Sequence, residues 1–206
     1  MERCGQYDCA SLFSEIAMAR SYTLKRRAEQ QAQTRQRIVE AAVDLHGTVG
    51  PARTSLSMVA EKAGVQRNTL YSHFPDERSL LMACSALSLE RDPPPDAADW
   101  RGIADMAERL RTGLKAIYRW YSGGAELLGC VLRDAEQHAV VREVSELRYG
   151  PAVMGWHGVL GEGLSGEQQA LLHLALGFHS WRALAREAGL SDEAAAELMV
   201  GAIIRA

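Results

Sequence analysis

The chain has 206 residues, 47% of them hydrophobic and 6% aromatic, and its formal net charge is -3. This length allows one or two domains with a hydrophobic core, and the composition fits a soluble helical protein. No apolar run approaches the ~18 residues that a membrane span needs, and the first residues lack the basic-then-apolar pattern of an export signal. We therefore expect a cytoplasmic protein that does not cross a membrane.

The charges are distributed unevenly along the chain. From residue 20 to residue 78 there are ten Lys and Arg against six Asp and Glu, whereas from residue 79 onward there are twelve against seventeen. An electropositive first part joined to an acidic second part suits a protein that touches DNA phosphates with one domain only, because phosphate contacts supply most of the sequence-independent affinity for DNA.

Residues 1–33 precede the first recognisable domain, and we expect them to be a flexible extension. The segment that begins at Met18 resembles a natural start, so residues 1–17 are predicted to have no role in the core. Lys25, Arg26 and Arg27 form a basic cluster. This cluster is compatible with an arm that follows the DNA backbone or enters the minor groove, and equally with a mobile solvated tail.

From Thr34 the sequence becomes helical. Thr34 is a suitable cap, and apolar residues at helical spacing predict a stripe that covers the two helices that follow. The stripe consists of Ile38, Ala41, Ala42 and Leu45. Gly47, Gly50 and Pro51 end this helix.

Residues 54–76 predict two short helices joined by a tight turn. Ser55 or Ser57 caps the first helix, and Gly64 can take the left-handed conformation that ends it. The apolar positions are Leu56, Val59, Ala60 and Ala63 in the first helix and Leu70, Tyr71 and Phe74 in the second. This arrangement is a helix-turn-helix.

The second of these helices carries a polar row. The row is Gln66, Arg67, Asn68, Thr69, Tyr71 and His73. In a helix-turn-helix this first turn meets base edges in the major groove, where arginine can bond guanine, asparagine can bond adenine and a threonine methyl can touch thymine. The last two residues are placed to reach phosphates. A helical hairpin with a solvated polar face is the alternative interpretation.

The run Ala60-Glu-Lys-Ala-Gly-Val-Gln-Arg-Asn-Thr-Leu-Tyr-Ser-His-Phe-Pro-Asp resembles the amino-terminal DNA-binding domain of the tetracycline-repressor (TetR) family. Arg37-Ile-Val-Glu-Ala-Ala before it and Leu80-Leu81 after it extend the resemblance over residues 34–81. The resemblance implies an all-α, TetR-like homodimer. Its three-helix DNA-binding domain would bind a palindromic double-stranded operator, and its helical second domain would bind a small ligand that releases the DNA, usually in a repressor.

Two positions depart from the family pattern. Gln66 replaces the usual Ser or Thr cap, and Glu77 stands where family members often carry a DNA-contacting Lys, a contact that Arg78 could take over. The predicted DNA-binding residues are Arg35, Arg37, Thr54, Ser55, Gln66, Arg67, Asn68, Thr69, Tyr71, His73 and Arg78.

The predicted domains are residues 34–80, which bind DNA, and residues 81–206, which regulate and dimerise. Asp76 caps a helix that continues to Arg91 and, in the family, links the two domains. The three prolines of residues 93–95 form a linker. Further helices are predicted at residues 100–121, 125–136, 140–164, 165–189 and 191–205, with a kink at Gly150-Pro151.

Two residue sets are predicted for this second domain. A wall of apolar and aromatic residues for a small lipophilic or aromatic effector is Met106, Leu110, Ile117, Tyr121, Met154, Trp156, His157, Phe178 and Trp181. Apolar residues of the last two helices are predicted to pack against their copies in a symmetric dimer. These residues are Leu172, Ala175, Leu176, His179, Leu198, Met199, Ala202 and Ile203. Both sets are also compatible with a plain hydrophobic core.

No catalytic or metal-binding motif is present, so we expect neither enzyme activity nor a cofactor. The four cysteines, at positions 4, 9, 84 and 130, form no Cys-x-x-Cys pair, and the histidines of the second domain lack the i, i+4 spacing of a helical metal site. Two alternative functions remain: a helical interaction protein that has lost DNA binding, and a ligand-binding enzyme with an unrecognised site.

Overall fold

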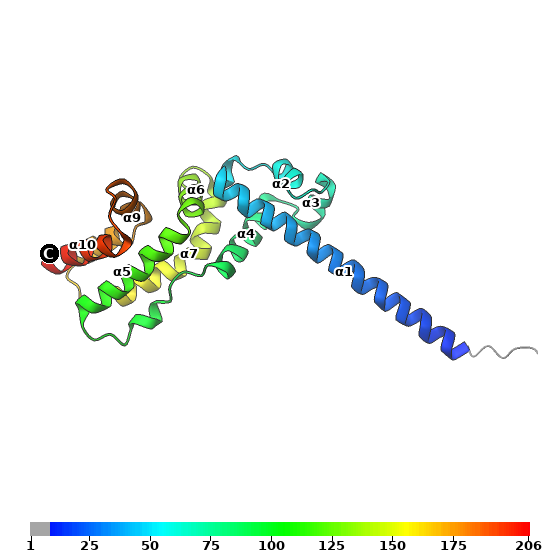
Figure 1. Cartoon of the computed structure of the whole chain (residues 1–206), viewed down its shortest axis with the longest axis horizontal. Helices are drawn as coiled ribbons and strands as arrows, with labels where there is room; N and C mark the ends of the chain where they lie inside the picture. Colours follow the sequence, from blue (N-terminus) through cyan, green and yellow to red (C-terminus); the bar gives the residue numbers. More distant parts are fainter. Residues whose placement is uncertain (1–8) are drawn as a thin grey trace, which may run out of the picture.

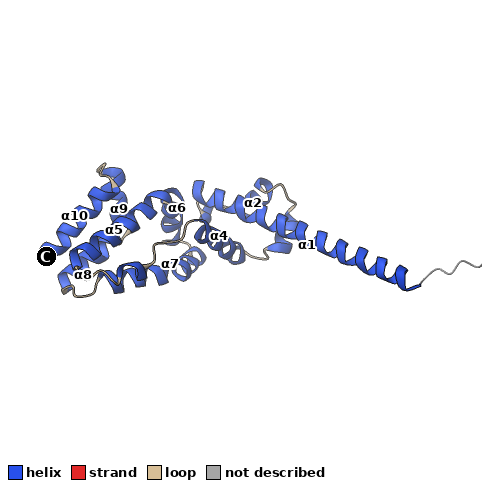
Figure 2. Ribbon diagram, turned by 60° about the horizontal axis from the view of Figure 1, so that its bottom comes forward, coloured by secondary structure: helices blue, strands red, loops and turns tan. Residues whose placement is uncertain are grey.

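The computed structural model describes residues 9–206, with side chains described for Tyr22 and from Leu24 onward. This part of the chain is all-α, as predicted (Figures 1 and 2). The first three α-helices, which we call the head, are α1 (Cys9–Thr48), α2 (Leu56–Lys62) and α3 (Arg67–His73). Helix α4 (Glu77–Arg91) leads into the body, which comprises α5 (Met106–Gly123), α6 (Ala125–Ala135), α7 (Ala139–Leu160), α8 (Gly166–Ala175), α9 (Phe178–Arg182) and α10 (Asp192–Arg205).

The head has its own hydrophobic core. One face of α1 supplies Ile38 and Ala42, which are fully buried, and α2 supplies Val59. Leu70 and Phe74 from α3 and its end complete the centre. Because α4 contributes Leu80 and Cys84 to the same cluster, this helix is packed into the head as well as into the body.

The body core is rich in aromatic rings. Tyr118, Tyr121, Trp156 and Trp181 are all buried among the helices of the body. Each polar atom of these rings has a partner: the two tyrosine hydroxyls donate to the carbonyl oxygens of Ala175 (2.9 Å) and Leu176 (2.6 Å), and the indole N–H groups of Trp156 and Trp181 donate to Pro95 and Asp192 (2.8 Å each). Satisfied polar atoms allow these large rings to be buried without an unpaired group.

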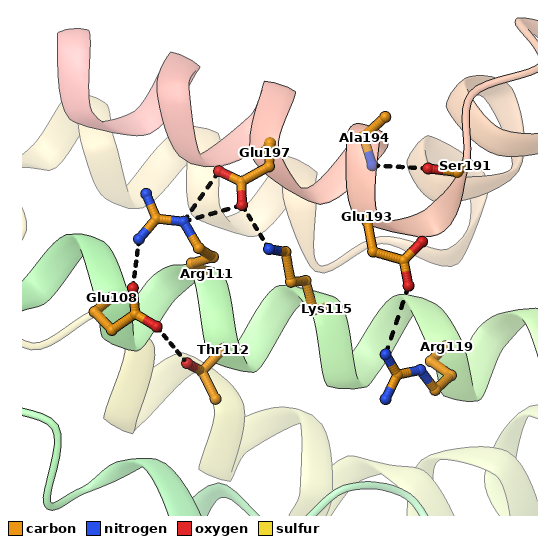
Figure 3. Close-up of polar contacts among 9 residues, drawn as sticks. All are labelled: Glu108, Arg111, Thr112, Lys115, Arg119, Ser191, Glu193, Ala194 and Glu197. Carbon is orange, nitrogen blue, oxygen red and sulfur yellow. Dashed lines mark hydrogen bonds and ion pairs between the residues drawn. The ribbon is translucent and has the colours of Figure 1, made fainter.

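An ion-pair row fixes α10 along α5 (Figure 3). Glu197 accepts hydrogen bonds from Arg111 at 3.0 Å and Lys115 at 2.6 Å, and Glu193 lies 3.5 Å from Arg119. The bonds from Lys115 and then Arg111 hold the pKa of Glu197 below its usual range. These pairs are at the surface, so they set the register of the two helices more than they stabilise the fold.

Three helix boundaries differ from the sequence predictions. Helix α1 begins at Cys9 instead of Thr34, because residues 24–33 are mostly good helix formers without Gly or Pro. The predicted helix over residues 165–189 is broken at Gly177, where α8 ends and α9 begins. Helix α5 begins at Met106 instead of Trp100, because Asp105 caps it and residues 97–100 form a separate 3-10 turn. Helix α7 is one helix through Pro151, with Val144 and Trp156 buried on either side, and the kink there stays a prediction.

Four predicted helix caps are confirmed. Ser55, Asp76, Ser165 and Ser191 each accept a backbone N–H bond at the start of α2, α4, α8 and α10, respectively. Residues 1–8, the first part of the predicted extension, lie outside the described residues.

Candidate nucleic-acid interface

The turn between α2 and α3 has the predicted geometry. The Ser55 hydroxyl oxygen accepts the Met58 N–H at 3.3 Å, and Gly64 adopts a φ of 64°, the left-handed conformation that reverses the chain after α2. Gln66 precedes α3 without making a side-chain cap bond, as expected for a residue that replaces Ser or Thr. Its amide is therefore not used to hold the helix end.

Helix α3 is sharply divided into a buried and an exposed side. Leu70 and Phe74 are only 1% exposed and anchor the helix in the head. Gln66, Arg67, Asn68 and Tyr71 are exposed, whereas Thr69 and His73 are half-buried. The predicted polar row is thus brought together on one surface, and its first three residues border a shallow hollow shared with Ser57 and Glu61 of α2.

The predicted DNA-binding residues outside α3 differ in whether their polar groups are free to bind a phosphate. Thr54 donates its hydroxyl hydrogen to the Gly50 carbonyl oxygen at 2.7 Å, so this hydroxyl cannot donate to a phosphate at the same time. The Ser55 hydroxyl accepts the cap bond and keeps its own hydrogen for another acceptor. Arg35 and Arg37 are exposed on α1, and the Arg35 guanidinium lies 4.9 Å from the centre of the Phe74 ring, beside the end of α3.

Arg78 faces the body in this structure. Its Nε and Nη2 donate to Glu143 of α7 at 2.9 and 2.7 Å, and these bonds raise the pKa of the guanidinium. The neighbouring Glu77 lies 3.5 Å from His138, also at the start of α7. The first turn of α4 is therefore joined to α7 by two polar contacts, and Arg78 would have to leave Glu143 to reach DNA.

A further polar contact joins the head to the body, and the sequence did not predict it. The Asp134 carboxylate of α6 is 7% exposed and accepts the Ala52 N–H at 2.9 Å and the Arg133 Nε–H at 2.8 Å. Burial acts to raise the pKa of Asp134, but the bonds from Arg133 and Ala52 outweigh it and lower this pKa. Gly50 makes space for this carboxylate because it has no Cβ. Its φ is 101°, and a Cβ there would lie 2.5 Å from Asp134 Oδ2.

Most residues predicted to line an effector site are buried in the core of the body. Leu110, Ile117, Tyr121, Trp156, Phe178 and Trp181 are buried against one another, Met106 and His157 are half-buried, and Met154 is 71% exposed. None of these nine residues borders the cavity of about 40 Å³ between head and body. That cavity is lined instead by Val43, His46, Pro51, Leu81, Cys84, Ser85, Ser88, Leu127, Val131, Val141, Val144, Ser145 and Tyr149, from α1, the α1–α2 loop, α4, α6 and α7.

The predicted dimer residues are also mostly internal. Leu172, Ala175, Leu176, Met199 and Ile203 are buried in the core of the protomer, and Ala202 is half-buried. Only His179 and Leu198 are exposed. Periodicity identified the buried stripe of α8 and α10, and this stripe faces α5 and α7 instead of a second copy.

The remaining reactive groups whose side chains are described form no cluster. Among Tyr22 and the residues from Leu24 onward, no three His, Cys, Asp or Glu side chains come close enough to hold a metal ion. Burial raises the pKa of the Cys84 thiol to about 12, so this cysteine is unreactive at neutral pH. None of the helices in the described part of the chain is long and apolar enough to cross a membrane.

Sequence comparison identifies the family of the head. Residues 38–84 match the family model described as bacterial regulatory proteins, tetR family. The chain is 36% identical over 75 residues to the HTH-type transcriptional regulator SrpR of Pseudomonas putida, and this match covers 35% of each chain. The chain thus spans only about a third of the length of the curated relatives it matches.

Solved structures extend the similarity to the whole fold. A TetR-like transcriptional regulator from Rhodococcus sp. RHA1 has a TM-score of 0.62 at 22% identity, over 84% of this chain and 94% of that one. NalD, the secondary repressor of the MexAB-OprM multidrug efflux pump in Pseudomonas aeruginosa, has a TM-score of 0.61 at 22% identity, over 86% and 96%. At such identities the likeness shows the fold alone. Residues 38–84 thus belong to the tetR family of bacterial regulatory proteins, and the chain shares its fold with TetR-like regulators of known structure.

Proposed function

We propose that the protein is a dimeric transcriptional regulator that reads a palindromic DNA operator with α3 and leaves it when a small uncharged ligand binds. The observation that carries this proposal is the exposed polar row of α3, held on a packed head by the buried Leu70 and Phe74. Repression is the mode we infer, by analogy with NalD, whose fold is similar. A protein with this task works in the cytoplasm, where the DNA is.

Base reading is assigned to the start of α3. Arg67 and Asn68 are exposed in its first turn, where a recognition helix meets base edges, and both side chains can form two bonds to one base. Tyr71, 43% exposed one turn later, is assigned to a phosphate. The Ser55 hydroxyl hydrogen is assigned to a phosphate of the DNA backbone. Thr54 instead holds the loop between α1 and α2 through its bond to Gly50.

The proposed dimer uses the outer face of α8 and α10. Since the predicted apolar residues fill the protomer, the surface left for a second copy is made of Leu174 (54% exposed) and Leu198 (48%), with small exposed neighbours at Ala170 and Ala194. A two-fold axis through this face would present two copies of α3 to one duplex, as a palindromic operator requires.

The effector is proposed to enter the cavity between head and body. Its lining contains no Asp, Glu, Lys or Arg, and burial lowers the pKa of His46 to about 4, which leaves that imidazole neutral at pH 7. A charged ligand would therefore be buried without a counter-ion, at a large cost in free energy. Ligand pockets usually measure ~300–1,000 Å³, so the cavity would have to widen and thereby move α4 and α6 relative to the head.

Selection of duplexes from a random DNA library with the full chain, followed by gel-shift titration, tests the proposal. Asn68→Ala should weaken binding to the selected operator by ~1–3 kcal/mol and relax preference at one base pair, whereas Tyr71→Phe should weaken binding to all sequences alike. Arg101→Gln, at an exposed position of the body outside α3, α8 and α10, is the control. If no duplex is enriched and affinity for random DNA does not fall with added salt, the chain is not a DNA-binding protein and an interaction protein or enzyme becomes the better interpretation.

A further inference from the structure

The amino-terminal part of α1 projects from the head as an isolated helix. In both views it leaves the head on the side away from the body (Figures 1 and 2). Every side chain from Leu24 to Gln33 is exposed, whereas Ile38 and Val39, little more than one turn later, are buried in the head. We call residues 24–37 the basic rod. Because its last turn is continuous with the packed part of α1, the direction of the rod is set by the head.

The rod carries a strong excess of positive charge. Its five basic residues are Lys25, Arg26, Arg27, Arg35 and Arg37, and its only acidic residue is Glu29. Arg26, Gln30, Gln33 and Arg37 follow the i, i+4, i+7, i+11 spacing that places side chains on one face of a helix. Arginine and glutamine are side chains that bond phosphate oxygens, and all four are exposed.

The base of the rod lies beside the recognition helix. Arg35 stacks on Phe74 at the end of α3, so a duplex docked on α3 also passes close to this part of α1. From Arg37 back to Arg26 the helix rises ~16 Å, the length of about five base pairs. The basic end of the rod is therefore within reach of DNA just outside the bases that α3 can read.

We propose that the basic rod binds the phosphate backbone of the DNA that flanks each half-site, which lengthens the footprint of each subunit by about five base pairs without reading sequence. This inference rests on the proposed DNA-binding function. Duplex DNA is favoured over a second protein chain because Leu24 is the only large apolar residue between residues 24 and 33, so the rod has no apolar seam for a partner helix.

The test compares the full chain with the variant Lys25→Gln/Arg26→Gln/Arg27→Gln on two duplexes: a selected operator trimmed to its half-sites, and the same operator with ten extra base pairs on each side. Wild type should bind the long duplex at least tenfold more tightly, and the variant should bind both duplexes equally. Each phosphate contact contributes ~0.9 to the slope of log K against log salt, so losing three contacts per subunit should reduce this slope by about 3 to 5 on the long duplex. Arg101→Gln/Arg182→Gln/Arg186→Gln removes the same charge from exposed sites on the body outside α8 and α10 and serves as the control.

The outcomes separate the two proposals. If wild type binds the trimmed operator but gains nothing from the flanks, or if the rod variant keeps the slope of wild type, the rod proposal is overturned and the DNA-binding function stands. If the control variant loses as much as the rod variant, the effect is one of net charge and the rod proposal is again overturned. If wild type selects no operator at all, both proposals fall. Binding of the rod to anionic vesicles instead of flanking DNA would also overturn it.

Discussion

The carboxylate of Asp134 allows a quantitative test of the joint between head and body. Asp134→Ala removes a charged acceptor from the Ala52 N–H and leaves Arg133 with only the Val49 carbonyl oxygen as a partner. A hydrogen bond to a charged group contributes ~1.5–3 kcal/mol. Because the Arg133 side chain is 49% exposed, water takes over much of its lost interaction, and we expect the variant to lose about 2–3 kcal/mol of unfolding free energy.

The same carboxylate predicts a pH dependence. The pKa of Asp134 is lowered in the folded protein. A lowered pKa means that the stabilisation is fully present above the unfolded pKa of about 4 and is lost as the pH falls below it toward the folded pKa. Wild type should therefore lose more unfolding free energy than Asp134→Asn over this interval, because the amide does not titrate.

Urea unfolding followed by far-UV circular dichroism at pH 7 and at pH 3.5 measures both effects. Glu136→Ala, which removes an exposed carboxylate two residues away, is the matched control and should change the unfolding free energy by less than ~0.5 kcal/mol. If Asp134→Ala unfolds at the same urea concentration as Glu136→Ala, the buried bond to Ala52 does not hold the head to the body and the reasoning is refuted.

Three further predictions concern neighbouring parts of the molecule. Gly50→Ala should lower the melting temperature in a thermal scan, because its Cβ would collide with Asp134 at a backbone φ of 101°; a melting temperature equal to that of wild type would contradict this. Glu143→Gln should raise affinity for the selected operator a few-fold in gel shifts by freeing Arg78, and unchanged affinity would show that Arg78 makes no DNA contact. Leu172→Ala should cost ~2–5 kcal/mol of unfolding free energy. Leu174→Glu should instead leave the fold intact and convert the dimer to a monomer in sedimentation experiments. If Leu174→Glu still sediments as a dimer, α8 is excluded from the interface.

Apart from the start of α1, the head could be predicted in detail from the sequence because its signals are local. Ser55 and Asp76 cap helices within three residues of their own position, and Gly64 provides the left-handed turn that few other residues adopt. The exposed side of α3 follows from the burial of Leu70 and Phe74 one turn apart. Caps, turns and periodicity act over less than two helical turns, so no distant contact was needed to recognise them.

The functional surfaces of the body could not be predicted in this way. Periodicity separates an apolar face of a helix from a polar one, but it does not say whether the apolar face meets the same chain or a second copy. Leu172 and Leu174 are both leucines of α8, and only the position of α10 and α7 makes the first internal and the second exposed. For the same reason the aromatic residues that suggested a ligand wall, such as Trp156 and Trp181, fill the core instead.

The joint between head and body was decided by the tertiary structure alone. Asp134 and Ala52 are 82 positions apart, and Arg78 and Glu143 are 65 apart. No local pattern links such pairs, because each forms only after the packing of α1, α4, α6 and α7 has brought the loops together. The sequence by itself thus determined the short helices of the head, the turn between them and the polar row of α3, through interactions between near neighbours. The cavity, the buried carboxylate and the free face of α8 depend on how separate helices pack, and only the folded chain specifies that.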